Sequence, residues 1–383
     1  MQACTALPFD APPPRPTMGT CNCDRQSEDA LKILHTADLH LRKRDDERWQ
    51  ALCDLLEMAA EEEVDAFLVC GDMFDAAVDA EELISPLRQI FSGRPFRVLL
   101  LPGNHDREAY SSGRYFGDSA GVLESLAPER LGDATIVGLP FQDIEGEELM
   151  ARLRELRGIL DPDETNVLLY HGELLDALPL DTSRADFGEE GSQRYMPVRL
   201  SYFDDLPVRY VLAGHFHRRF SRRRLGQDGW FVYPGSPVSI TRRETGPRQV
   251  NLFEVGNEPA PRSLDTPHYE TVTVRLDPSD DVAPEEAVAA HLAQLHPAAM
   301  PLLRVEGYVD CAKLGRTESE LVERIADLAE DCADTTFDFH DISRVLQDEL
   351  FQEFRQRVKA DEEPERADSL IELALRAMRE VGL

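Results

Sequence analysis

Acidic residues, an asparagine and histidines stand directly after apolar runs at five places in the sequence. In chain order these motifs are Asp38-Leu39-His40, Gly71-Asp72, Gly103-Asn104-His105-Asp106, His171-Gly172 and Gly214-His215-Phe216-His217. Their oxygen and nitrogen atoms suit Mn²⁺, Fe²⁺ or Zn²⁺, and the lack of cysteine among them argues against a structural zinc site. The set is large enough for two ions if one carboxylate bridges them, so the motifs predict a divalent metal centre.

Each motif taken alone has an ordinary structural explanation. A Gly-Asp pair after a strand is usually a turn, and a histidine inside a strand, such as His35, usually packs or forms a hydrogen bond. Order and placement distinguish the five motifs from such cases, because each one follows an apolar run and carries a glycine or a second ligand. We therefore interpret the motifs as parts of one site.

The apolar runs before the motifs alternate with helical patterns, which predicts an α/β fold. Strands are expected at 33–34, 66–69, 97–101, 135–139, 166–170, 210–213, 230–233 and 249–255. These are about eight strands in one sheet-based domain, with helices at 47–62 and 81–90. Because α/β sheets bind ligands in the crevice at the carboxyl ends of their strands, this architecture would bring the motifs together.

The rest of the chain divides into segments of different composition. Residues 1–30 are proline-rich and are expected to be a disordered tail, in which Met18 is a second candidate start. The strands and motifs occupy 31–258. Residues 266–340 read as a small α+β domain, and 341–383 as helices with a break at Pro364. Within 266–340, strands are expected at 270–276, 302–309 and 335–339, and helices at 284–295 and 318–329.

The final helix is expected to have one apolar face. Its apolar residues recur at i, i+3 and i+4 spacing, and they are Leu370, Leu373, Ala374, Ala377, Met378 and Val381. Ser369 and Glu372 would form a capping box at the start of this helix. Such a face either folds back on the preceding domain or binds a groove of a partner, and both alternatives stay open.

The charge of the chain bears on its partners. The formal net charge is −32, from 73 acidic and 41 basic residues, which by itself argues against a nucleic acid ligand. The basic residues, however, gather beside the motifs, at Arg42, Lys43, Arg44, Arg218, Arg219, Arg222, Arg223, Arg224, Arg242, Arg243 and Arg248. Either these residues form a basic rim that attracts a polyanion, or they are surface arginines paired with nearby carboxylates.

The sequence lacks signs of a membrane or secreted protein. No stretch approaches the roughly 18 consecutive apolar residues of a spanning helix, and the N-terminus lacks a basic region followed by an apolar run. The seven cysteines are scattered without a C-x-x-C pair, which argues against a disulfide framework. We therefore expect a soluble, cytoplasmic protein.

The order of the five motifs resembles that of the calcineurin-like metallophosphoesterase superfamily. Within it, the chain is similar to the SbcD-type DNA repair exonucleases. The segments that carry this likeness are His35-Thr36-Ala37-Asp38-Leu39-His40-Leu41, Gly71-Asp72-Met73-Phe74-Asp75, Ala213-Gly214-His215-Phe216-His217 and Tyr233-Pro234-Gly235-Ser236-Pro237. The resemblance covers 31–255 and implies a layered α/β phosphoesterase domain, followed by a small α+β capping domain that selects DNA and by C-terminal helices.

The resemblance also implies roles for individual residues. Asp38, His40, Asp72 and His217 would hold one metal, and Asp72, Asn104, His171 and His215 the other, with Asp72 as the bridge. His105 would donate a hydrogen bond or proton to the phosphate or the leaving oxygen, and Asp106 would orient it. DNA contacts would come from Arg42, Arg218, Arg219, Arg222, Arg223 and Arg224.

The implied protein is a Mn²⁺-dependent DNA exonuclease and endonuclease, a homodimeric nuclease subunit whose C-terminal helices grip an SbcC-like coiled-coil ATPase. Two residues depart from relatives, since Asp75 stands where some have histidine and Arg42 where glycine is common, which leaves substrate preference open. The alternatives are a stand-alone phosphodiesterase or phosphatase and a scaffold that has lost catalysis. A Ser/Thr phosphatase would have an arginine soon after Gly-Asp, and Met73-Phe74-Asp75-Ala76 has none.

Overall fold

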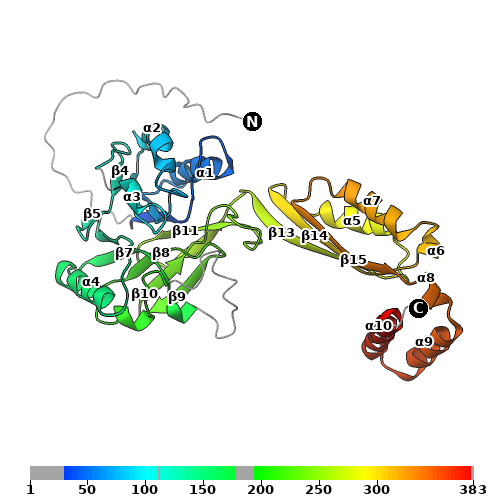
Figure 1. The fold of residues 1–383 in the computed structure, drawn as a ribbon. Helices are drawn as coiled ribbons and strands as arrows, with labels where there is room; N and C mark the ends of the chain where they lie inside the picture. Colours follow the sequence, from blue (N-terminus) through cyan, green and yellow to red (C-terminus); the bar gives the residue numbers. More distant parts are fainter. Residues whose placement is uncertain (1–29, 111–112, 178–193, 381–383) are drawn as a thin grey trace. The chain divides into compact units, whose positions relative to one another are not determined.

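The computed structural model describes residues 30–110, 113–177 and 194–380 and divides the chain into two compact units (Figure 1). We call Met1–His268 the N-terminal unit and Tyr269–Leu383 the C-terminal unit. The tail predicted at 1–30, with Met18, lies outside the described residues except for Ala30. None of the described helices is long and apolar enough to cross a membrane.

The N-terminal unit contains two six-stranded sheets. The first has the order β12 (Ala260–Ser263), β11 (Gln249–Glu254), β1 (Lys32–Thr36), β2 (Ala66–Cys70), β3 (Arg97–Leu101) and β4 (Ala120–Val122). The second has the order β5 (Glu129–Leu131), β6 (Ala134–Leu139), β7 (Thr165–His171), β8 (Tyr210–Gly214), β10 (Gly229–Tyr233) and β9 (Ser221–Leu225). The α/β class is confirmed, but the expected eight strands in a single sheet were too few.

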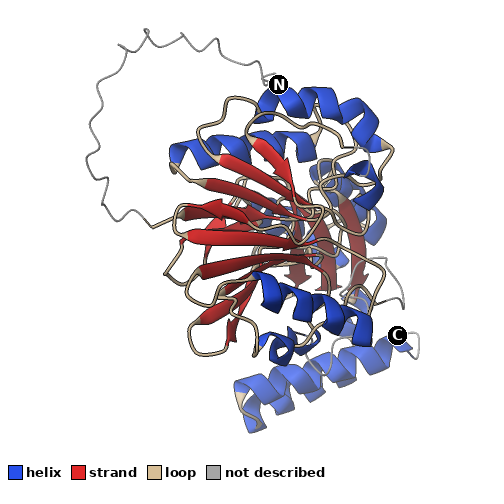
Figure 2. Ribbon diagram, turned by 90° about the vertical axis from the view of Figure 1, so that its left-hand side faces the viewer, coloured by secondary structure: helices blue, strands red, loops and turns tan. Residues whose placement is uncertain are grey.

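The two sheets stack face to face between layers of helices (Figure 2). Helices α1 (Glu47–Glu61) and α2 (Asp79–Phe91) pack on the outer face of the first sheet, and α4 (Gly146–Ile159) packs on that of the second. The two-residue period of the strands produces this arrangement, since Phe67 and Val69 of β2 face the helices while Leu68 faces the other sheet. The short helices of this unit are α3 (Arg107–Tyr110), η1 (Leu175–Ala177) and η3 (Leu200–Phe203).

The C-terminal unit is built on a three-stranded sheet of β13 (His268–Leu276), β14 (Ala299–Val309) and β15 (Asp334–Asp341). Helices α5 (Pro284–Leu292) and α7 (Glu318–Leu328) share its apolar core, and α6 (Cys311–Leu314) follows β14. A capping box between Thr317 and Glu320 begins α7. The predicted strands and helices occur in the predicted order, and α6 is an additional short helix that was not predicted.

The chain ends in α8 (Ser343–Gln347), α9 (Glu349–Asp361) and α10 (Pro364–Glu380). The predicted capping box at Ser369 is wrong, because α10 begins five residues earlier at Pro364 and places Ser369 inside the helix. Part of the predicted apolar face folds back, since Ala374 and Met378 pack against the small core that contains Phe351 and Leu375. Leu373 is 62% exposed, and Val381 lies outside the described residues.

Candidate metal centre

All five motifs lie at the carboxyl ends of parallel strands. β1, β2 and β3 run parallel in the first sheet, and β7 and β8 run parallel in the second. Contacts between the motifs join the two sheets, since the backbone N–H of His215 donates to both carboxylate oxygens of Asp38, each at 3.0 Å. The prediction that the strand ends would bring the motifs together is correct.

Two groups of side chains have donor atoms close enough to share an ion. They are Asp38, His40 and His217, and Asp38, Asp72 and His171, with ligand atoms within 4.8 Å of one another in each group. The Nε2 atoms of His40 and His217 are 3.2 Å apart. Two nitrogens bound to one ion at about 2.1 Å would be separated by about 3.0–3.4 Å. The spacing of these two rings therefore fits a common metal.

Asp72 lies between the two groups of histidines. Its Oδ2 is 3.2 Å from Nε2 of His171 and 3.9 Å from Nε2 of His40. Nε2 of His171 is also 2.8 Å from Oδ1 of Asn104. The ring of His215 lies 5.5 Å from that of His171, centroid to centroid. These positions suit the bridging role expected for Asp72, although the residue that belongs to both groups is Asp38.

A hydrogen-bond acceptor faces Nδ1 of three of the histidines. Nδ1 of His171 lies 2.9 Å from the carbonyl oxygen of Cys70, at the end of β2. Nδ1 of His40 lies 3.4 Å from Oδ1 of Asp75, and Nδ1 of His217 lies 3.3 Å from Oε1 of Glu244. When Nδ1 carries the proton toward such an acceptor, Nε2 keeps its lone pair for a metal. The donor set and its orientation thus fit divalent cations.

Glu244 is a member of this site that the sequence pattern did not indicate. It is buried, and besides His217 it accepts hydrogen bonds from the backbone N–H of Ile240 at 2.7 Å and the hydroxyl of Thr241 at 3.1 Å. Glu244 lies in a polar segment of the sequence and does not follow a strand directly, so the residues beside it in the sequence did not indicate a metal site. The nearest signal is Ser236, in the Tyr-Pro-Gly-Ser-Pro segment, which lies 3.4 Å from Glu244.

Arg248, expected on the basic rim, is buried and only 1% exposed. Its Nε donates to the carbonyl oxygen of Ser236 at 3.0 Å, and its Nη2 donates to that of His217. This arginine therefore supports the loop that carries His217 and does not face solvent. Its inclusion in the rim was wrong.

Four expected ligands have a left-handed backbone. Asp38, His40, Asp72 and His215 have φ angles of 55°, 47°, 51° and 105°. Residues with side chains seldom adopt these angles, and such strain gathers at functional sites. The strained backbone angles of the motifs thus place the ligand side chains, and this strain lowers local stability.

Glycines beside the ligands allow the loops to come together. A side chain on Gly71 would overlap the ring of His171, and one on Gly103 would overlap Asp72. One on Gly214 would meet the carbonyl oxygen of Cys70. The glycines in the motifs are therefore required by close approach as well as by turn geometry.

His105 lies at the edge of the same cluster. Its ring is 4.8 Å from that of His40, centroid to centroid, and its backbone N–H donates to Oδ1 of Asp72 at 3.0 Å. Its Nδ1 lies 3.1 Å from the backbone carbonyl oxygen of Asp75. That carbonyl orients the imidazole ring.

Asp106 has a different role from the expected one of orienting His105. Its Oδ2 accepts from the backbone N–H of Met73 at 2.7 Å and from the hydroxyl of Tyr110 at 3.1 Å. Its Oδ1 accepts from the N–H of Gly103 at 2.8 Å. Burial, with the nearby charge of Asp72, raises the pKa of Asp106 to about 7. Asp106 thus ties two ligand loops together from inside the protein.

The electrostatics of the site favour bound cations. Burial raises the pKa of Asp38 above its ordinary value. Burial acts in the same direction on Asp72, but the charge and hydrogen bond of His171 overcome it and hold the pKa of Asp72 well below its usual range. Two buried carboxylates in one cluster need compensating positive charge, which divalent ions supply.

Several arginines of the expected rim already have partners. Nε of Arg42 lies 2.9 Å from Oδ2 of Asp75, and Arg222 pairs with Glu258. The guanidinium carbons of Arg222 and Arg224 lie 5.5 and 4.0 Å from the ring centroid of Trp230. Arg218, Arg219 and Arg223 are exposed. Arg42 and Arg222 therefore pair with carboxylates, which is one of the two alternatives that the sequence left open.

Comparison with known proteins adds independent information. Residues 31–219 match the family model described as calcineurin-like phosphoesterase. The DNA double-strand break repair protein Mre11 of Methanosarcina acetivorans is 23% identical over 73% of this chain and 46% of that protein. The Mre11 of Sulfurisphaera tokodaii is 30% identical over 56% of this chain and 55% of that protein. The SbcD subunit of the nuclease SbcCD of Rhodobacter capsulatus is 27% identical over 69% of this chain and 76% of that protein. The chain spans about half the length of the first two relatives.

Proposed function

Residues 31–219 match the calcineurin-like phosphoesterase family model, and on that premise we propose that the chain is a metal-dependent nuclease acting on DNA. The observation that carries the proposal is the pair of ligand groups that share Asp38, with Asp72 between their histidines. Relatives named as a double-strand break repair protein and as a nuclease subunit support DNA as the substrate.

We assign two ions to the site. Asp38, His40, Asp72 and His217 would hold one, and Asp72, Asn104, His171 and His215 the other. Oxygen and nitrogen ligands in this mixture suit Mn²⁺, which we propose as the working metal, ahead of Fe²⁺ and Zn²⁺. Bound by these residues, two such ions would supply activation of a water molecule and stabilisation of negative charge on the phosphate.

The protein's own residues supply the rest of the reaction. With Nδ1 of His105 facing the carbonyl of Asp75, its Nε2 would be the ring atom that donates to a phosphate oxygen or to the leaving oxygen. Asp75 and Glu244 would keep His40 and His217 in the tautomer that presents Nε2. Asp106 would hold the loops of Asp72 and Asn104 in register.

We further propose that the chain works in the cytoplasm as the nuclease subunit of a complex with an SbcC-like coiled-coil ATPase, and as a homodimer. The C-terminal unit would select DNA, and α9 and α10 would dock the ATPase. Two exposed leucines support the docking role, since Leu350 is 75% and Leu373 is 62% exposed. Arg218, Arg219, Arg222, Arg223 and Arg224 remain candidate DNA contacts.

One comparison of substrates tests the proposal. The purified chain would be given Mn²⁺ and labelled hairpin, single-stranded or duplex DNA, beside bis-p-nitrophenyl phosphate as a generic phosphodiester. A nuclease should cut at least one DNA substrate far more efficiently than the small ester. Rapid hydrolysis of the small ester without DNA cleavage would instead indicate a stand-alone phosphodiesterase.

A further inference from the structure

A buried arginine from outside the five motifs reaches the first of them. Arg48 is the second residue of α1, and its side chain is buried. The start of this helix is fixed by its N-cap, because Asp46 accepts from the backbone N–H of Trp49 at 2.9 Å. A buried guanidinium needs partners for its positive charge, and the hydrogen bonds of Arg48 lead to the candidate metal centre.

One nitrogen of Arg48 joins two segments of the site. Its Nη1 donates to the carbonyl oxygen of His40 at 2.5 Å and to Oδ1 of Asp75 at 3.2 Å. The same carboxylate oxygen lies 3.4 Å from Nδ1 of His40. Arg48, Asp75 and His40 therefore form a closed triangle of contacts, in which both the backbone and the ring of His40 take part.

The backbone of His40 is strained at this point. Its φ angle of 47° lies in the left-handed region, which residues with side chains seldom adopt. The N–H of His40 donates to the carbonyl oxygen of Asp72 at 2.9 Å, and the N–H of Leu41 donates to that of Met73 at 2.9 Å. Arg48 holds the carbonyl group between these two amides. A charged donor makes a stronger hydrogen bond than a neutral one, so it suits a strained position.

Asp75 extends this support to the expected proton donor. Its carbonyl oxygen lies 3.1 Å from Nδ1 of His105, and its backbone N–H donates to the carbonyl oxygen of Leu41 at 3.1 Å. The residue that Arg48 holds by its carboxylate thus also faces the ring of His105. Through Asp75, Arg48 is connected to a proposed ligand and to the proposed donor.

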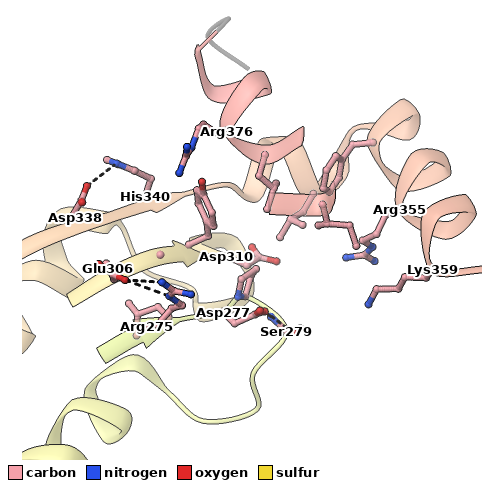
Figure 3. A pocket seen from close by; sticks show the side chains of 18 of the residues that line it. Arg275, Asp277, Ser279, Glu306, Asp310, Asp338, His340, Arg355, Lys359 and Arg376 are labelled. Atoms are coloured by element: carbon pink, nitrogen blue, oxygen red, sulfur yellow. Dashed lines mark hydrogen bonds and ion pairs between the residues drawn. The ribbon is translucent and has the colours of Figure 1, made fainter. Parts of the chain in front are cut away.

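Burial distinguishes Arg48 from other arginines that pair with carboxylates. Nε of Arg42 lies 2.9 Å from Oδ2 of Asp75, but the side chain of Arg42 is 58% exposed. In the C-terminal unit, Arg275 pairs with Glu306 at 3.1 Å beside a hollow, and its side chain is 75% exposed (Figure 3). Water screens such exposed pairs, so they hold their partners weakly. The side chain of Arg48 is only 7% exposed, so its contacts are screened much less.

We propose that Arg48 is a positioning residue of the metal centre. It holds the carbonyl of His40 and the carboxylate of Asp75 in the arrangement that directs Nε2 of His40 toward the ion. The proposal rests on the proposed function, because it takes His40 as a metal ligand. Arg48 acts through His40 and is not itself a ligand.

Titration of the full chain with Mn²⁺, in competition with a fluorescent chelator, tests this role. Arg48→Met keeps much of the side-chain volume and removes the charge. It should weaken one of the two bound ions by roughly 10–100-fold and leave the other unchanged, because His40 belongs to one of the two ligand groups. Arg48→Lys keeps the charge, so it should restore part of the affinity that Arg48→Met loses. If Arg48 merely filled space, Arg48→Met would bind Mn²⁺ at least as well as Arg48→Lys, which would overturn the proposal.

A double-variant cycle with His40 separates positioning from general stability. His40→Gln should itself weaken that ion, and adding Arg48→Met should weaken Mn²⁺ binding no further, because Arg48 acts through His40. Arg97→Met is the matched control and should leave both ions unchanged. Arg97 also pairs with a carboxylate, that of Glu129 at 2.6 Å, but it begins β3, whose other end carries the third motif.

Three further results would overturn the proposal. They are unchanged affinity in Arg48→Met, equal weakening of both ions, and an additional loss in the double variant. If circular dichroism shows that Arg48→Met does not fold, Arg48→Lys becomes the test. It should bind the affected ion more weakly than the wild type, and equal affinity would overturn the proposal.

The same titration keeps this proposal apart from the nuclease assignment, because Mn²⁺ binding is measured without DNA. A wild-type chain that binds both ions but leaves DNA intact would contradict the nuclease assignment alone, and the effect of Arg48→Met would still support the positioning role. A wild-type chain that binds no Mn²⁺ would contradict both.

Discussion

His40 and His217 are supported in the same way, although they come from different sheets. Each presents Nδ1 to a carboxylate, of Asp75 at 3.4 Å and of Glu244 at 3.3 Å. Asp75 also lies 3.2 Å from the buried Arg48, which donates to the carbonyl of His40. These neighbours would set the tautomer and direction of the two rings, so the proposed site would be organised by residues that are not themselves proposed ligands.

The carboxylate behind His217 yields the first prediction. Glu244→Gln should lower metal affinity by roughly 10–100-fold, because the amide fixes the ring less firmly and carries no charge. Competition with a fluorescent chelator measures the affinity. Glu254→Gln, at an exposed position of β11, is the control and should bind metal normally. Equal affinities in the two variants would remove Glu244 from the metal centre.

The ligands themselves give the second prediction. Asp72→Asn and His215→Ala should abolish hydrolysis and reduce bound metal, because the first weakens the proposed bridge and the second removes a ligand. Elemental analysis of the purified variants gives the metal content per chain. Variants that keep two metals and the full rate would show that the ligand assignment is wrong.

His105 should behave differently from the ligands. His105→Ala should leave the metal content unchanged while turnover falls by roughly 10²–10³, since the change removes a donor to the transition state and no ligand. Parallel measurement of metal content and kcat separates the two effects. A joint loss of metal and rate would make His105 a structural residue.

Sequence reasoning located the residues that follow strands and missed those that support them. Asp38 and His171 could be found because a strand end with a glycine or second ligand is a local pattern. Glu244 and the carbonyl of Asp75 could not, because their contacts join segments that are 27 and 30 residues apart and depend on folded loops. Asp106 stood in a recognised motif, yet it accepts hydrogen bonds from the backbones of two loops and from the hydroxyl of Tyr110, contacts that no local pattern indicates.

At the scale of elements, long and apolar strands were predicted and short or polar ones were not. β4 and β5 have three residues each, and β12 is exposed along its whole length, so neither length nor alternation marks them. Helix α4 was also missed, although Leu149, Leu153 and Leu156 recur on one buried face. The helix was not predicted because many of its residues are charged and because it begins at a glycine, Gly146, which is a poor helix former.

Strand β9 shows how a charge pattern conceals an element. Its sequence, Ser-Arg-Arg-Arg-Leu, reads as a basic loop, yet it pairs antiparallel with β10 at the edge of the second sheet. Pairing places Arg222 and Arg224 on the face that bears Trp230, and the alternation of side chains turns Arg223 to the opposite face. In this strand Arg222 and Arg224 therefore stack on Trp230, while Arg223 is exposed to solvent on the other face.

Changing Arg222, Arg223 and Arg224 together to Ala gives the fourth prediction. DNA affinity should fall while hydrolysis of a small phosphodiester stays normal, because these side chains would contact phosphates outside the metal site. The slope of log K against log salt should flatten by about one unit for each arginine that contacts a phosphate. An unchanged slope would assign the three arginines to pairing and stacking within the fold.

At the scale of the whole molecule, the proposed metal ligands and the terminal helices lie in different units. The proposed ligands, His105 and Asp106 all lie within Met1–His268, whereas Tyr269–Leu383 contributes a small sheet and the terminal helices. The sequence indicated this division, since the segments 31–258 and 266–340 were expected to be separate domains.

The terminal helices lead to the last prediction. α10 packs on α9 through the core around Leu375. Part of its apolar face therefore folds back on the chain, which is one of the two alternatives that the sequence left open. Leu350 and Leu373 remain outside that core and exposed, which is the pattern of a surface for helix-in-groove binding. Leu350→Glu with Leu373→Glu should therefore abolish co-purification with the proposed ATPase while leaving Mn²⁺-dependent phosphodiester hydrolysis and the melting temperature unchanged.

The control for this experiment is an equally large change on the same helices. Arg357→Glu alters charge at an exposed position of α9 and should still allow the ATPase to co-purify if the leucines form the contact. Deleting 343–383 should reproduce the effect of the double variant, because it removes both leucines together. A double variant that retains the ATPase at full yield would place the docking surface elsewhere. A double variant with a lowered melting temperature would show that the two leucines stabilise the fold, because the loss of buried apolar contacts lowers stability.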